Sequence, residues 1–316
     1  PWNTPGARVV LRSPPGRPGS WIVTIPGERL PALPKRKPAG LPEPRAKSVD
    51  VAGINVSARS DTEASAGSAA SHTQKTDDGL TVRVLGPVEV VGWIQAPSRR
   101  VVTELGCFLA LHGDRNATGE EIRAALWPGD LGASEASAKS LRNTVSLLRK
   151  ALGPDLVPEA QRGSGYRFAD GVRCDWTIFD RLVAEAEGPQ EKEKLREALS
   201  LVRGAPFEGV PPGSFTWAWT ELFVSRIEVA VASAANRLGE LALAEGDVET
   251  AIWAALQGLS SAPNELSLWS LHLRASAKSN IGALERTWKS ARAVLGDDSR
   301  DLIPLLQELR SEFPRT

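Results

Sequence analysis

The chain has 316 residues, of which 41% are hydrophobic and 24% charged, and its 38 Lys and Arg residues balance 38 Asp and Glu residues. These values are ordinary for a soluble globular protein of about two domains. Because the formal net charge is zero, they exclude attraction of nucleic acid by the charge of the chain as a whole. The two cysteines, Cys107 and Cys174, lie far apart without metal-ligand spacing. We therefore predict no disulfide framework, no metal site and a reducing, cytoplasmic location.

The first 79 residues predict little hydrophobic core. Residues 1–44 are rich in proline and contain two β-branched runs, at 8–12 and 21–25, which fit either a small hairpin or the remnant of an upstream domain. Residues 45–79 hold almost no large apolar side chain, which predicts a disordered linker. Because the chain starts at Pro1 and contains no methionine, we expect it to be part of a longer protein. The sequence leaves open a membrane tether in the missing region.

The next segment predicts a small sheet followed by two helices. Leu80–Val91 alternates between apolar and polar residues around a Gly-Pro turn, which is typical of two short strands. Ser98–His112 carries apolar residues around most of its circumference and predicts a buried helix. Thr118 followed by Glu121 is the reciprocal capping pattern that begins a further helix, which ends at Trp127.

The stretch from Ser137 to Leu152 predicts an amphipathic helix with one basic face. A rotation of roughly 100° per residue stacks its apolar side chains on one side and gathers cationic and hydrogen-bonding side chains on the other. Between Ser134 and Leu152 four cations oppose one acid, Glu135, so the local balance is plus three. The apolar set is Leu141, Val145, Leu148 and Leu152, and the polar set is Lys139, Arg142, Asn143, Ser146, Arg149 and Lys150.

A hairpin is predicted directly after this helix. Leu156-Val157 and Tyr166–Phe168 form its two short strands, and the glycines between them allow a tight reversal. A basic helix sized for a major groove beside a basic hairpin is the plan of a winged helix-turn-helix. We therefore predict base-edge contacts for Arg142, Asn143 and Ser146, and phosphate contacts for Lys139, Arg149, Lys150, Arg162 and Arg167.

From Asp175 onward the pattern is helical, with Gly- and Pro-containing breaks that predict seven helices. Two similar turns, Ala244–Ala251 and Ala277–Ala283, begin 33 residues apart, close to the tetratricopeptide period. Trp217 and Trp219 are predicted to line a groove for a partner, with core packing as the alternative for aromatics at helical spacing.

Four motifs together resemble the antibiotic regulatory protein family of actinobacterial activators. They are Val84–Val90, Ala124–Pro128, Leu141–Gly153 and Gly165–Arg167. In that family a winged helix of the response-regulator type precedes a helical bacterial transcriptional activator domain, and residues 80–312, about three-quarters of the chain, fit this order.

The resemblance implies a homodimer that binds direct repeats in duplex DNA, with the helical domain contacting RNA polymerase or another protein. The second half is most similar to the cytosolic C-terminal part of membrane-anchored actinobacterial proteins that carry this domain. At Leu147 the sequence departs from the family, which commonly has a basic residue there.

The sequence thus predicts a mainly α protein. Residues 80–174 form a winged helix-turn-helix with small β-sheets, and residues 175–316 form a tetratricopeptide-like helical domain. The predicted function is transcription regulation through duplex DNA and a protein partner. Phosphate-loop, metalloprotease and nucleophile-elbow motifs do not occur in the sequence, so neither an enzyme activity nor a cofactor is predicted.

The alternative is a signalling adaptor or ligand-sensing scaffold. In that case the winged helix no longer reads DNA, and the helical domain binds a peptide, another protein or a small regulatory ligand.

Overall fold

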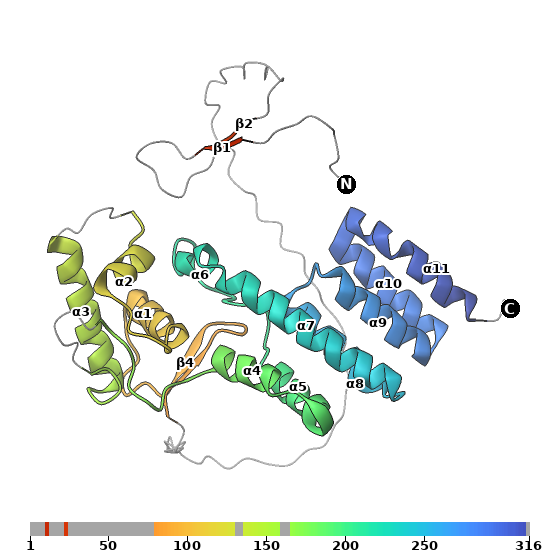
Figure 1. The fold of residues 1–316 in the computed structure, drawn as a ribbon, viewed down its shortest axis with the longest axis horizontal. Helices are drawn as coiled ribbons and strands as arrows, with labels where there is room; N and C mark the ends of the chain where they lie inside the picture. The colour runs from red at the N-terminus through yellow and green to blue at the C-terminus, as the bar shows by residue number, and fades with distance from the viewer. Residues whose placement is uncertain (1–9, 13–21, 25–78, 130–134, 159–164, 314–316) are drawn as a thin grey trace, which may run out of the picture. The chain divides into compact units, whose positions relative to one another are not determined.

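The computed structural model describes residues 10–12, 22–24, 79–129, 135–158 and 165–313, and the chain divides into two units. The first unit, Pro1–Ser71, contains β1 (Val10–Arg12) and β2 (Ile22–Thr24), which pair antiparallel (Figure 1). The predicted linker at residues 45–79 lies outside the described residues except for Gly79. The second unit, His72–Thr316, contains all the other elements.

The second unit begins with a three-stranded sheet and three helices. The sheet order is β4-β3-β5, in which β3 pairs antiparallel with β4 and parallel with β5. The strands and helices predicted before residue 153 are confirmed. The elements are β3 (Thr81–Arg83), β4 (Glu89–Val91), α1 (Arg100–Leu111), α2 (Gly119–Leu126), α3 (Glu135–Leu152) and β5 (Arg173–Cys174).

The capping box at the start of α2 is also confirmed. The Thr118 hydroxyl accepts a hydrogen bond from the Glu121 amide at 3.2 Å, and the Thr118 amide donates to the Glu121 carboxylate at 2.7 Å. Two backbone donors at the helix start are satisfied in this way, which fixes where α2 begins.

The predicted pairing of the wing strands is wrong. Tyr166 instead pairs with Ala117, just before α2, through two backbone hydrogen bonds of 2.7 and 2.8 Å. Gly165, at φ +75°, permits this approach, because a Cβ there would lie 2.6 Å from the Ala117 carbonyl oxygen. Among the described residues one backbone hydrogen bond, from the Ala169 amide to the Leu156 carbonyl at 3.0 Å, joins the first predicted strand to the residue that follows the second.

The rest of the second unit is helical, as predicted, but it has eight α-helices and two 3₁₀ turns within residues 175–313 instead of seven helices. The α-helices are α4 (Asp175–Ala184), α5 (Glu191–Ser200), α6 (Thr216–Thr220), α7 (Phe223–Ala244), α8 (Val248–Ser261), α9 (Leu266–Ser279), α10 (Ile281–Leu295) and α11 (Ile303–Ser311). The 3₁₀ turns are η1 (Gly188–Gln190) and η2 (Gly296–Leu302).

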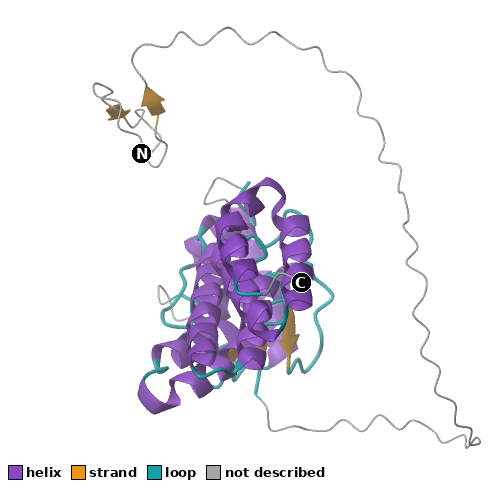
Figure 2. Ribbon diagram, turned by 90° about the vertical axis from the view of Figure 1, so that its right-hand side faces the viewer, coloured by secondary structure: helices purple, strands orange, loops and turns teal. Residues whose placement is uncertain are grey.

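The 33-residue period appears in the caps of two helices. Asp247 caps α8 by accepting from the Thr250 amide, and Asn280 caps α10 by accepting from the Ala283 amide. The helices α7 to α10 stack in sequence order, and Figure 2 shows the helices of this unit packed side by side. Gly258 permits the close contact of α8 with its neighbours, since a Cβ there would lie 2.8 Å from Ala235 and Leu268. Both features are those of stacked helical pairs.

The two halves of this unit share one hydrophobic core. The buried Asp175 carboxylate, at the start of α4, accepts hydrogen bonds from the Val84 and Leu85 amides beside β3. The loop before α6 adds a backbone hydrogen bond from Phe207 to the Val84 carbonyl, at 3.0 Å. The Phe215 amide donates to the buried Glu104 carboxylate of α1 at 2.7 Å. The winged helix and the helical domain are therefore one packed body.

Candidate nucleic-acid interface

The helix α3 presents one face to the core, as its sequence period predicts. Leu141, Val145, Leu148 and Leu152 are at most 5% exposed and pack against α1 and α2. The burial of four such side chains, at roughly 1.5–3 kcal/mol each, fixes the rotation of the helix about its axis. The opposite face is consequently directed to solvent.

That outward face carries five of the predicted DNA contacts. Its side chains are exposed, and none of its cations makes an ion pair within the described part of the chain. Several cations of the helical half differ in this respect, because Lys192, Arg237 and Arg274 pair with carboxylates. The exposed residues of the face are Lys139, Arg142, Asn143, Ser146 and Lys150.

Arg149 is positioned differently from its neighbours. It is half-buried, and its guanidinium donates to the carbonyls of Val157 at 2.9 Å and Pro158 at 3.1 Å. These contacts tie the end of α3 to the segment that follows it. Arg149 therefore positions that segment, and a phosphate would have to compete with these hydrogen bonds for its guanidinium.

 Two of the predicted phosphate contacts follow α3 in the sequence. Arg162 is outside the described residues, and the side chain of Arg167 is exposed.

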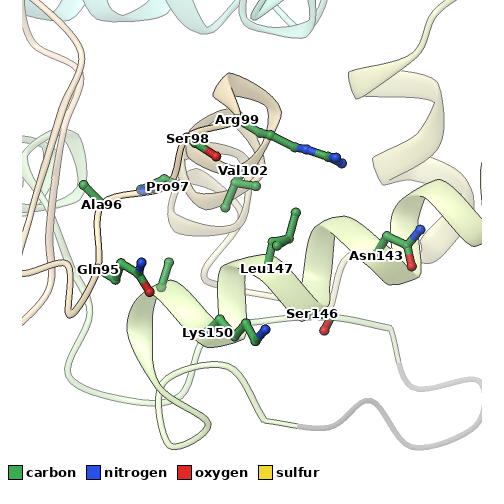
Figure 3. A pocket seen from close by; sticks show the side chains of 11 residues that line it. Gln95, Ala96, Pro97, Ser98, Arg99, Val102, Asn143, Ser146, Leu147 and Lys150 are labelled. Carbon is green, nitrogen blue, oxygen red and sulfur yellow. The ribbon is translucent and has the colours of Figure 1, made fainter.

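A groove of about 640 Å³ runs between α3 and the start of α1. Asn143, Ser146 and Lys150 line it from α3, so the structure brings three predicted contact residues together there (Figure 3). Arg99 lines it from the start of α1, and no carboxylate is among its lining residues. Sequence reasoning missed Arg99, although the basic pair Arg99-Arg100 directly before an apolar helix was a usable signal.

Leu147 lies within this groove and is half-buried. In Figure 3 its side chain points toward Val102 of α1 rather than along the outward face of α3. The residue that departs from the resembled family thus forms part of the groove's apolar lining.

The prediction that Trp217 contacts a partner is wrong, because Trp217 is a core residue, although it is among the residues that line a hollow between α2 and α6. It is 1% exposed, and its ring packs edge-on against Phe108 and Phe223 at centroid distances of 5.1 and 5.9 Å. Trp219, two residues later, is 47% exposed. Leu222, three residues after Trp219, has φ 62° and is 61% exposed. Trp219 therefore remains the candidate for a partner contact.

The two cysteines have the properties of buried structural thiols. Cys107 and Cys174 are both free and buried. Burial raises the pKa of Cys174 to about 11, and it also raises the pKa of Cys107. A thiol held in its protonated form is a poor nucleophile and metal ligand. No cluster of metal-ligating side chains occurs among the residues that the structure describes.

Comparisons with known proteins agree with this architecture. The bacterial transcriptional activator domain family matches residues 174–313. Among solved structures, EmbR from Mycobacterium tuberculosis, determined in complex with a low-affinity phosphopeptide, is similar with a TM-score of 0.52 and 20% sequence identity. The similarity covers 75% of this chain and 66% of that chain, and at this identity it shows the fold. No curated protein matches the chain at a significant level.

Within the described part of the chain, every helix is too short or too polar to cross a membrane. Residues 174–313 belong to the bacterial transcriptional activator domain family, and a three-stranded sheet and helices α1 to α3 accompany this domain in the same unit.

Proposed function

We propose that this protein is a transcriptional regulator that binds duplex DNA through the outward face of α3. The observation that carries the proposal is a set of exposed cations on that face, Lys139, Arg142 and Lys150, none of which makes an ion pair with a residue that the structure describes. Cations that are not neutralised by the protein itself are available to phosphates, and phosphate contacts supply most of the affinity of nonspecific DNA binding.

The polar residues between these cations suit contact with base edges. Asn143 and Arg142 are adjacent on the exposed face of α3. Asparagine pairs through two hydrogen bonds with adenine, and arginine pairs in the same manner with guanine, in the major groove. Ser146 adds a hydroxyl one turn further along the helix. We assign sequence reading to these three residues and backbone positioning to Lys139 and Lys150.

We further propose that the helical domain contacts a protein partner, such as RNA polymerase, through Trp219. The indole is half-exposed on α6, whereas most aromatic side chains of this region lie in the core. Large aromatic side chains are enriched at the energetic centres of protein interfaces. Because the winged helix and the helical domain share a core, a partner held at Trp219 is also held at a fixed position relative to α3.

The test is a titration of a fluorescently labelled random-sequence duplex, followed by anisotropy at about 50 and 200 mM salt. We expect the affinity of the wild type to fall steeply between the two conditions. Arg142→Ala and Lys150→Ala should each weaken binding at about 50 mM salt, because each removes one exposed cation. Lys289→Ala, which removes an exposed cation from α10, is the matched control and should leave the affinity unchanged.

The proposal is wrong if the wild type does not bind the duplex at the lower salt concentration. It is also wrong if binding is unaffected by the two α3 variants. Either result favours the alternative in which the chain is an adaptor or ligand-sensing scaffold.

A further inference from the structure

We propose that the groove between the start of α1 and α3 holds one sugar–phosphate strand of the duplex, with Arg99 and Lys150 contacting its phosphates from opposite walls. This inference rests on the DNA binding proposed above and extends it to a second element. It assigns a positioning contact to Arg99, which lies outside α3.

The geometry places two cations across one groove. Arg99 lies on the α1 wall and Lys150 on the α3 wall, and both line the same hollow of about 640 Å³. Figure 3 shows the Arg99 side chain extending from the start of α1 alongside α3. Neither cation makes an ion pair with a described residue. A strand seated between them would meet positive charge on both sides.

The composition of the groove matches a sugar–phosphate strand. Its polar donors, Ser98 and Gln95 among them, stand beside an apolar part formed by Val102 and Leu147. A deoxyribose-phosphate chain is likewise amphipathic, because its phosphates are charged and its sugars carry C–H faces. Hydrogen bonds to phosphate and sugar are the commonest contacts in protein–DNA complexes, and they fix the register of the protein on the duplex.

Charge distinguishes this groove from two other hollows of the same unit. Glu121 and Glu221 line a hollow of about 480 Å³ between α2 and α6. A hollow of about 1150 Å³ beside α4 is lined by four carboxylates, Asp180 and Glu197 among them, which offset the four arginines in its lining. Carboxylates repel a phosphate strand, and the groove beside α3 has none among its lining residues. The charge complementarity therefore favours a polyanion in this groove and not in the other two.

The local electrostatics of α1 support the same occupant. Arg99 and Arg100 stand at the helix start, which lacks both a side-chain cap and an acidic residue in its first turn. Cations are disfavoured at this end of a helix dipole, and an anion nearby is favoured. By contrast, α2 has Glu120 and Glu121 in its first turn. A DNA phosphate in the groove would supply the negative charge that α1 itself lacks.

The experiment uses the same random-sequence duplex with the whole chain and compares variants within one helix start. Each phosphate contact that is lost lowers the slope of log affinity against log salt by about 0.9, which is about 3.5-fold in the ratio of affinities between about 50 and 200 mM. We expect Arg99→Ala to reduce this ratio by about 3.5-fold. Arg100→Ala, the same change one residue later at a side chain that does not line the groove, should leave the ratio unchanged.

A second variant tests whether a cation on this wall of the groove produces the salt dependence of DNA binding. Ser98 is exposed and lines the same wall, so Ser98→Arg in the Arg99→Ala background returns a guanidinium to the groove. We expect it to restore most of the lost salt dependence. All three positions are exposed, and equal melting temperatures of the variants serve as the check on folding.

The outcomes separate this inference from the proposed function. If the wild type fails to bind the duplex, the proposed function fails and this inference fails with it. If the wild type binds and Arg142→Ala weakens it, but Arg99→Ala behaves as the wild type or as Arg100→Ala, the groove assignment alone is overturned. Absence of rescue by Ser98→Arg, with folding intact, also overturns it.

Discussion

Asp175 joins the two halves of the second unit, and its replacement by alanine is expected to destabilise both. The carboxylate is 4% exposed and accepts from the amides of Val84, Leu85 and Trp176 at distances between 2.8 and 3.0 Å. The Arg203 guanidinium lies 3.8 Å from the same group. Asp175→Ala therefore leaves three buried backbone donors without their acceptor.

The expected loss follows from these three donors. A buried donor left without a partner costs about 1–3 kcal/mol. Burial raises the pKa of Asp175, while the amides of Val84 and Leu85 oppose this shift, so removing the carboxylate also relieves a desolvation cost. We therefore take the lower end, about 1 kcal/mol per donor, and expect a total loss of about 3 kcal/mol. For a folded unit of this size that corresponds to a fall in melting temperature of about 6–12 °C.

Thermal unfolding followed by circular dichroism measures this loss. Asp180→Ala is the matched control, because Asp180 lies on the same helix and is exposed. It should change the melting temperature little. The reasoning is refuted if Asp175→Ala melts within the error of the wild type, or if the two variants lose the same stability.

Two further predictions concern single side chains. Trp217→Ala should cost about 3–5 kcal/mol of stability, whereas Trp219→Ala should cost much less because 47% of its surface is already exposed; equal losses in chemical denaturation would contradict the burial assigned to Trp217. The Thr118 amide and then the Arg115 guanidinium lower the pKa of Glu121 to about 2, below its unfolded value of about 4.3. Ionised Glu121 therefore stabilises the fold above the unfolded pKa, and this stabilisation is lost as pH falls toward 2. The difference in melting temperature between the wild type and Glu121→Gln should shrink over that range, and a difference independent of pH would count against the assigned cap.

Local patterns predicted the parts of the fold that local interactions determine. The apolar period of α3 gave the rotation of the helix and so its outward face, because Leu141 and Leu148 must be buried together. The pair Thr118 and Glu121 predicted the start of α2, because a capping box involves residues only three positions apart. The outward direction of Arg142 followed from the same period.

Contacts between distant residues account for what the sequence did not predict. Asp175 marked a change of pattern in the sequence, but its carboxylate binds an amide 91 residues earlier. Trp217 and Trp219 have the same chemistry, and tertiary packing, such as that of Phe108 and Phe223 against Trp217, distinguishes them. Arg149 shares the polar side of the helix period, yet the carbonyl of Val157 is within its reach.

A photo-crosslink from α3 to DNA tests the central claim most directly. Ser146 is replaced by a benzophenone-bearing amino acid, and Ser290, an exposed serine of α10, is replaced in a second protein as the control. After irradiation with labelled duplex, we predict a covalent protein–DNA adduct from position 146 and none from position 290. Adducts from position 290 alone, or a bound duplex that never crosslinks to position 146, would contradict the assignment of α3 as the DNA-reading helix.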